Sequence, residues 1–277
     1  MTTPAAYTPD LDAYFARTGY TGPRSPTLAT LHAIVAAHAT SIPFENLDVL
    51  LGRSIDLDPA AVERKLVHAR RGGYCFEQNS LLLHVLTALG YAVMPLSARV
   101  RWQRPRDFTP PRTHLFLRVD LAGEPWFVDV GVGSSSMAGA IRFVTDLEQP
   151  TPHEPRRIVH EDGKYFHQTR FEGAWHDVYD FTGEMMHPID RELANWFTSA
   201  HPQSHFRNRL VAARALPGGG RVSLLNRELT LRRADGTADK RELTSAADLL
   251  AVLAEHFGLH FPADTRFGPP GSPWPVE

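Results

Sequence analysis

The first third of the chain places apolar residues with the period of an α-helix. Positions 11–15 follow the i, i+3, i+4 rule. A second helix is predicted after Ser25-Pro26, a pair typical of an N-cap followed by proline at the first helical position. A third is predicted to begin at Asp58-Pro59. The most apolar helix is predicted over about 76–89 and ends at Gly90. The pattern therefore favours a helical first third.

From about Tyr91 the apolar positions alternate, as they do in strands. Segments 114–119 and 126–130 are predicted to pair as a hairpin around the turn at 121–124. Two further turn sequences, 161–164 and 171–174, lie between aromatic-rich segments. We therefore predict an antiparallel β domain over about 91–188.

The last portion returns to mixed patterning. A helix is predicted near 191–197, a flexible break at 217–220 and a hairpin turn at 234–237. Ser245 is predicted to cap a final helix that Gly258 ends.

Composition excludes several classes of protein. The chain has 277 residues, a formal charge of −2 and 43% hydrophobic residues, which is typical of a globular protein. The near-neutral charge argues against nucleic acid or an anionic membrane as the main partner. A single cysteine excludes an intrachain disulfide and a thiolate zinc cluster, and no metal is expected. Residues 1–12 show no signal-peptide pattern, so we expect a cytoplasmic protein.

Cys75, the one cysteine, lies where a glycine-rich segment meets the apolar helix. Gly72 and Gly73 allow the backbone a close approach, and the helix begins directly after the sulfur. The free N–H groups and dipole of a helix N-terminus favour a thiolate, the nucleophile that acyl transfer requires. The alternative is a buried structural cysteine, which is common.

A nucleophilic cysteine needs a base, and His114 opens the first strand of the predicted hairpin. If the turn is centred near the Ala122–Gly123 bond, the residue opposite His114 lies between positions 129 and 133. Asp129 is then directly opposite His114 or one diagonal step away, where a carboxylate orients an imidazole. The rivals His68 and His84 lie on helices beside Cys75, without an acidic partner at matching spacing.

Four separated motifs together resemble the arylamine N-acetyltransferase family. They are RGGYCFEQN (71–79), IPFENLD (42–48), THL (113–115) and VDVG (128–131). Segments 17–20 and 201–206 fit as well. The resemblance covers 11–210 clearly and the remainder loosely.

The resemblance implies an α+β fold in three parts. A helical bundle (1–90) would carry the nucleophilic cysteine, and a central antiparallel β-barrel-like domain (91–190) would carry His and Asp. An interdomain helix and a C-terminal α/β lid (191–277) would complete a cysteine-protease-like core.

The resemblance also implies a chemistry and its partners. Cys75, His114 and Asp129 would form a catalytic triad that moves an acetyl group from acetyl-CoA to an arylamine or arylhydrazine by a ping-pong reaction. Phe44 and Val132 would line the acceptor pocket, and the family commonly has an aromatic residue at the position of Val132.

Further residues match family positions around the cofactor and the cysteine. Thr113, Gly133 and Phe206 would contact CoA. Glu45 and Arg71 would form a buried ion pair that supports the cysteine loop.

Two other classes of enzyme use a Cys-His-Asp triad and remain as alternatives. One is a papain- or transglutaminase-like thiol hydrolase, although Cys75 lacks the papain-type sequence around the cysteine. The other is an amide synthase that closes an amide on a carrier-bound polyketide chain. The physiological amine and the oligomeric state are not predicted by the sequence.

Overall fold

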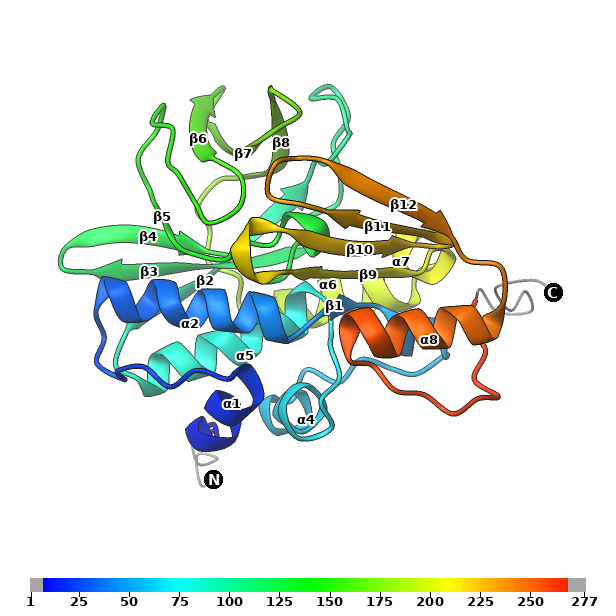
Figure 1. Ribbon diagram of the computed structural model, residues 1–277. Coiled ribbons are helices and arrows are strands. Elements are labelled where there is room, and N and C mark those ends of the chain that lie inside the picture. Colours follow the sequence, from blue (N-terminus) through cyan, green and yellow to red (C-terminus); the bar gives the residue numbers. More distant parts are fainter. Residues whose placement is uncertain (1–6, 269–277) are drawn as a thin grey trace.

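The computed structural model describes residues 7–268, and its first third is helical, as predicted. The helices of this part are α1 (Leu11–Thr18), α2 (Leu28–Ser41), α3 (Leu47–Leu50), α4 (Pro59–Glu63) and α5 (Cys75–Ala88). A π-helical turn (Arg64–His68) continues α4. Figure 1 shows α2 and α5 together beneath the strands that the middle of the chain forms.

The helix starts follow the capping residues of the sequence with one exception. The side chain of Asp58 accepts hydrogen bonds at the start of α4, and Ser245 does so at the start of α8 (Ala246–Phe257). The prediction that Ser25 caps α2 is wrong, because Thr27 takes that role and accepts from the backbone N–H of Thr30. Thr27 is extended, and its own N–H is engaged by the Ser25 carbonyl, so the helix starts two residues later.

The middle of the chain forms a seven-stranded antiparallel sheet with the order β5-β4-β3-β2-β8-β7-β6. Its strands are β2 (Ala92–Val100), β3 (His114–Leu121), β4 (Glu124–Val128), β5 (Ile141–Arg142), β6 (Arg156–Glu161), β7 (Lys164–Phe171) and β8 (Ala174–Phe181). Isolated bridges Thr145–Ile158 and Gln149–Arg156 tie the segment after β5 to β6, the strand at the opposite edge. The sheet therefore almost closes on itself, which confirms the predicted barrel-like α+β fold.

The inside of this barrel is packed with aromatic rings. Phe116 contacts Phe127, Tyr179 and Phe181, with ring centroids 5.0–5.3 Å apart. Edge-to-face and tilted pairs of this kind stabilise a core beyond the area that they bury. The packed interior holds the ends of β3 and β4 in place.

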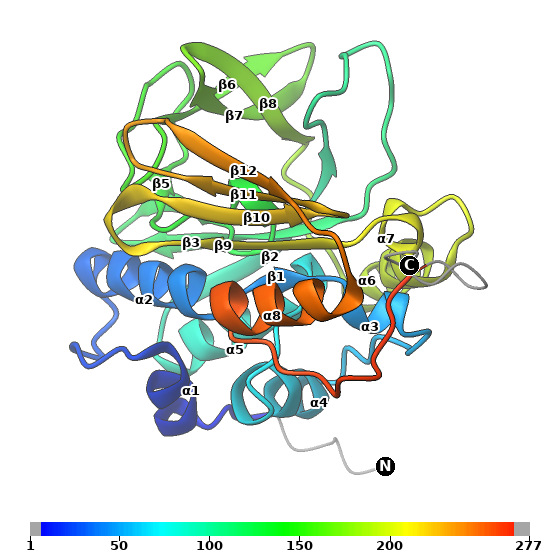
Figure 2. The ribbon, with the colours of Figure 1, turned by 45° about the vertical axis from the view of Figure 1, so that its right-hand side comes forward.

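A second sheet joins the first and last parts of the chain. Its order is β1-β9-β10-β11-β12, with β1 (Phe44–Glu45), β9 (Val211–Ala215), β10 (Arg221–Leu225), β11 (Glu228–Arg232) and β12 (Ala238–Glu242). Helix α8 covers one face of this sheet (Figure 2). Helices α6 (Pro188–Ala200) and α7 (His205–Asn208) precede β9 in the chain. The segment Pro217–Gly219 is a tight turn between two paired strands, so the expectation of a flexible break there is wrong.

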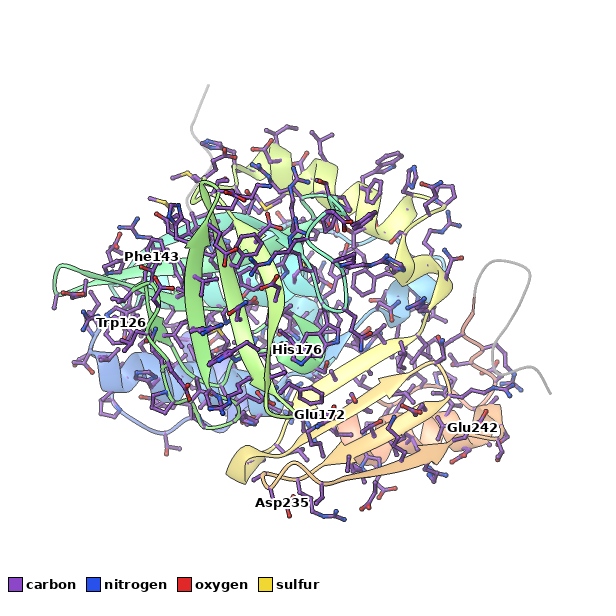
Figure 3. All side chains as sticks on the ribbon, turned by 90° about the horizontal axis from the view of Figure 1, so that it is seen from above. Trp126, Phe143, Glu172, His176, Asp235 and Glu242 are labelled. Atoms are coloured by element: carbon purple, nitrogen blue, oxygen red, sulfur yellow. The ribbon has the colours of Figure 1, made fainter. Side chains whose placement is uncertain are left out.

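The two sheets also touch at their tips. Seen from above, the barrel turn that carries Glu172 reaches toward the sheet that carries Asp235 and Glu242 (Figure 3). The guanidinium of Arg232 on β11 lies 4.1 Å over the ring of Phe171 on β7. This contact links the barrel to the C-terminal sheet.

Asn46 follows β1 directly and joins the helical part of the chain to β9 by hydrogen bonds. Its side-chain amide donates to the carbonyls of Phe206 and Arg209 at 2.7 and 2.8 Å and accepts from the N–H of Val211 at 2.9 Å. Asn46 is 1% exposed, so its own amide depends on these three hydrogen bonds.

We expect Asn46→Ala to lower the free energy of unfolding by about 2–3 kcal/mol, since it removes three hydrogen bonds made by a buried amide. Urea denaturation measures the change. Asn208→Ala is the matched control, because its amide also bonds two carbonyls but the residue is exposed. Equal losses in the two variants would contradict the role given to Asn46.

Candidate active site

Cys75 is the first residue of α5, one position earlier than the sequence predicts for the helix start. Tyr74 occupies the N-cap, and the carboxylate of Glu77 accepts from its backbone N–H at 3.0 Å. The sulfur therefore lies in the first turn, beside free N–H groups that stabilise negative charge. Cys75 is 3% exposed and packs in a cluster with Phe44, Tyr74 and Phe76.

His114 and Asp129 meet as the hairpin register requires. The strand pairs Leu117–Val128 and Leu121–Glu124 centre the turn on Ala122–Gly123. Continued outward, that register places Asp129 one diagonal step from His114. The Nε2 of His114 lies 2.7 Å from Oδ2 of Asp129, and both residues are almost fully buried.

Asn79, which the sequence analysis did not single out as a site residue, holds the second carboxylate oxygen. Its Nδ2 donates to Oδ1 of Asp129 at 2.9 Å and to the carbonyl of Leu115 at 2.7 Å, and its Oδ1 accepts from the N–H of Val130 at 3.1 Å. The N–H of Gly131 also donates to Oδ1 of Asp129. Asn79 follows Cys75 by four residues and so lies on the same helix face, which is the signal that could have identified it.

Gly131 allows the strand end to approach the helix. A Cβ at this position would lie 2.7 Å from the Cα of Cys75 and 2.7 Å from the amide nitrogen of Asn79. No side chain fits between these atoms, so glycine is required for the contact that brings Asp129 to the cysteine helix.

The electrostatics of the site favour a charged imidazole. Burial alone would lower the pKa of His114, but the Asp129 carboxylate and the adjacent Cys75 outweigh burial and raise the pKa to about 10. Since Nε2 is bonded to Asp129, Nδ1 is the nitrogen left for the sulfur. A protonated His114 offers a counter-charge for a thiolate at neutral pH.

A network of buried ion pairs holds the loop that precedes Cys75. Arg71 lies 2.7 Å from Glu45, whose side chain has no exposed area, so this predicted ion pair is confirmed. Lys65 lies 2.8 Å from Asp48 and 2.6 Å from Glu77, the residue that caps α5. Breaking a pair of this kind would leave a buried charge without a partner.

The residues predicted around the substrates divide into two groups. Phe44 is buried against the ring of Phe206, with centroids 5.9 Å apart, and a Cβ on Gly133 would lie 3.8 Å from Phe44. The carbonyl of Thr113 lies 3.6 Å from the sulfur of Cys75. These four residues gather on the cysteine side of the site.

Val132, the fifth residue predicted to lie around the substrates, packs against a different cluster from the other four. It is half-buried and packs against the aromatic core of the barrel.

The rival histidines lie apart from the cysteine. His68 does have an acidic partner, Glu63 at 3.3 Å, so the expectation that it lacks one is wrong. That pair spans five residues because the chain is π-helical there. His84 is half-buried beside the ring of Tyr7.

Neither a metal centre nor a membrane helix is visible in the described part of the chain. Between residues 7 and 268, no group of three or more His, Cys, Asp or Glu side chains is placed to hold a metal ion. Within the same residues, no helix combines the length and apolarity needed to cross a membrane.

Comparison with known proteins gives matches along most of the chain. Residues 27–266 match the N-acetyltransferase family model. An arylamine N-acetyltransferase of Escherichia coli is 42% identical over 91% of this chain and 89% of its own length.

Two solved structures share the fold. The arylamine N-acetyltransferase of Mycobacterium tuberculosis has a TM-score of 0.87 at 42% identity, covering 90% of this chain and 93% of that one. The Mycobacterium marinum arylamine N-acetyltransferase in complex with CoA has a TM-score of 0.86 at 38% identity, covering 90% and 92%.

The raised pKa of His114 predicts how stability depends on pH. The folded-state pKa lies above the unfolded value near 6.5, so the stabilisation is complete below about pH 6.5 and is lost as the pH rises to about 10. The free energy of unfolding of the wild type minus that of Asp129→Asn should fall by up to about 1.4 kcal/mol per pH unit in this window. Denaturant melts at a series of pH values measure it. A constant difference from pH 7 to 9.5 would show that Asp129 does not hold a proton on His114.

Proposed function

Because the chain belongs to the arylamine N-acetyltransferase family, we propose that Cys75 carries the acetyl group between acetyl-CoA and the nitrogen of an arylamine or arylhydrazine. The protein is an acyltransferase, and acetyl-CoA is its co-substrate. The observation that carries the proposed route is the buried contact of His114 with Asp129 at the N-terminus of the cysteine helix.

In the first half-reaction the Cys75 thiolate attacks the carbonyl carbon of acetyl-CoA. The thioester bond to CoA breaks, and the CoA sulfur leaves with the proton of the His114 imidazolium. The products are free CoA and an acetyl-Cys75 thioester, with His114 neutral. The raised pKa of His114 supports this step, since it supplies both the counter-charge for the thiolate and the proton for the leaving group.

In the second half-reaction the amine nitrogen attacks the carbonyl of acetyl-Cys75. His114, now neutral, accepts the proton that the nitrogen releases, and the Cys75 thiolate leaves. The imidazolium–thiolate pair is thereby restored. An arylamine suits this step because it is largely unprotonated at neutral pH and keeps its lone pair.

Asp129 is a positioning residue in this scheme. It fixes Nε2 of His114 as the nitrogen that faces the carboxylate and stabilises the charged ring. The amide of Asn79 and the N–H of Gly131 both donate to Oδ1 of Asp129, which leaves Oδ2 for His114.

The remaining assignments rest on the match of these residues to positions of the family. Phe44 and Val132 would line the acceptor pocket, and Thr113, Gly133 and Phe206 would contact CoA. Three parts of the chain would supply the site: 1–90 the nucleophile, 91–190 the histidine and carboxylate, and 191–277 the covering lid. A cytoplasmic location agrees with a mechanism that needs Cys75 as a reduced thiol.

We expect acetyl-CoA alone to leave one acetyl group on the protein, localised to Cys75 by peptide mass spectrometry. Since no amine is present, the reaction stops at the thioester and free CoA appears in equal amount. Cys75→Ala should give neither adduct nor transfer while its circular dichroism matches the wild type. Turnover by folded Cys75→Ala would contradict the covalent route. A chromogenic peptide serves as the control substrate and should not be cleaved.

Val132→Phe should narrow the acceptor pocket. We expect kcat/KM for a fused-ring arylamine to fall on the order of tenfold relative to that for a single-ring arylamine. The rate of acetylation of Cys75 by acetyl-CoA should change little, because that step precedes amine binding. Val100→Phe, at an exposed position on β2, is the matched control. An unchanged ratio between the two amines would place Val132 outside the pocket.

A further inference from the structure

Buried polar atoms without partners gather on the inner face of three barrel strands. Among residues 7–268, ten buried side-chain nitrogen and oxygen atoms have no hydrogen-bond partner, and six of them belong to Arg156, His167, Thr169 and Tyr179. The six are Nε and Nη1 of Arg156, both ring nitrogens of His167, Oγ1 of Thr169 and Oη of Tyr179. Buried polar groups are usually paired, so a concentration of unpaired ones is a candidate place for a bound water or ion.

Strand register places these four residues on one surface. Arg156 on β6 is directly opposite Thr169 on β7, and His167 lies two residues from Thr169 on the same face. Tyr179 on β8 is opposite His167, and their ring centroids are 4.7 Å apart. Tyr179 packs against the rings of Phe116 and His114, so this surface faces the barrel interior. We call these four residues the barrel cluster.

The charges beside the barrel cluster do not balance. Arg221 binds both oxygens of Glu154, at 2.7 and 2.6 Å, whereas Arg156 reaches the same carboxylate only from Nη2 at 3.4 Å. The Arg156 side chain is 1% exposed. Two buried guanidinium groups therefore share one carboxylate.

No second carboxylate is free to compensate Arg156 in the described part of the barrel. Asp129, whose charge acts on Arg156, is already paired with His114. Burying an unpaired charge costs several kcal/mol, so a counter-charge at this place would stabilise the fold.

The hydrogen-bonding chemistry of the barrel cluster suits an acceptor. Arg156 can only donate, and the hydroxyl of Thr169 can turn toward an acceptor, whereas the hydroxyl of Tyr179 already faces the Asp129 carboxylate. Burial and the charge of Arg156 hold the pKa of His167 well below its ordinary value, so His167 is neutral at pH 7 and donates from one nitrogen. A water molecule would accept at most two of these bonds and would bring no charge.

We propose that the barrel cluster binds a small monovalent inorganic anion of the halide class, with chloride as the ligand in ordinary buffers. The guanidinium of Arg156 supplies the charge, Thr169 and His167 supply neutral donors, and the ring of Tyr179 forms a wall of the site. The aromatic packing of the same interior, with Phe116 and Tyr179 at 5.0 Å between centroids, favours a monatomic ion over a phosphate or carboxylate.

The proposed anion site lies behind the candidate active site and does not depend on the proposed reaction. The ring of Tyr179 stands between the barrel cluster and the triad, 4.7 Å from the His167 centroid and 5.1 Å from that of His114. The ion would offset Arg156, whose charge otherwise acts on Asp129. A structural or thermal readout therefore tests the ion binding whether or not the acetyl transfer is confirmed.

Crystals grown in sodium bromide test the site directly. We expect an anomalous bromide peak inside the barrel, within hydrogen-bonding distance of the Arg156 guanidinium and of at least one other member of the barrel cluster. Density that refines as water, with no anomalous signal there, would overturn the proposal. Peaks confined to the protein surface would show an adventitious ion only and would count against it equally.

Thermal unfolding at constant ionic strength gives the second test. Replacing sodium gluconate, whose anion is too large to enter, with sodium chloride should raise the Tm of the wild type along a saturable curve. Arg156→Met should abolish the chloride-specific rise. Arg170→Met, an exposed neighbour of Thr169, should retain it. A rise of equal size in the wild type and Arg156→Met would reject the site.

If Arg156→Met does not fold, Thr169→Val keeps the proposal testable. Valine has the shape of threonine and removes a single donor, so the chloride concentration at half-saturation should increase about fivefold. An unchanged half-saturation concentration in Thr169→Val, together with the absence of bromide in the barrel, would exclude halide binding by the barrel cluster.

Discussion

The contact between the N-terminus of α5 and the ends of β3 and β4 is the constraint on which the site depends. Asn79 makes this contact with its whole amide: one end donates to Asp129 and to Leu115, and the other accepts from Val130. Gly131 allows the two backbones to meet, because any Cβ there would overlap Cys75 and Asn79. The helix that carries the sulfur and the hairpin that carries His114 and Asp129 are thus held together by buried hydrogen bonds, and their loss would separate the sulfur from the imidazole.

Local patterns in the sequence predict the parts of this arrangement that are local in the chain. The position of Cys75 at a helix start and the diagonal step between His114 and Asp129 follow from helix capping and from a two-residue turn. The start of α2 is not fixed by the local sequence, because Ser25 and Thr27 both have hydroxyls that can cap a helix. The extended backbone of Thr27 makes it the cap in the structure.

Contacts between distant segments could not be predicted in this way. The spacing of four residues places Asn79 on the helix face of Cys75, but the groups that its amide bonds belong to strand ends far along the chain. The pairing of β1 with β9 joins residues far apart in the chain, and so does the near closure of the barrel at Thr145 and Ile158. The barrel cluster depends on how β6, β7 and β8 pair, which the local sequence around each residue does not determine.

Three groups of buried charges among residues 7–268 differ in how completely they are paired. The network of Lys65, Arg71, Glu45, Asp48 and Glu77 is interlocked, so it holds the cysteine loop rigidly. The pair of His114 and Asp129 balances only while the imidazole keeps its proton, which makes that proton available for transfer to a leaving group. Arg156 has no carboxylate of its own, and the imbalance is resolved by bringing in an ion rather than by a further side chain. Rigidity, proton transfer and ion binding therefore follow from one physical rule, that charge removed from water must be matched nearby.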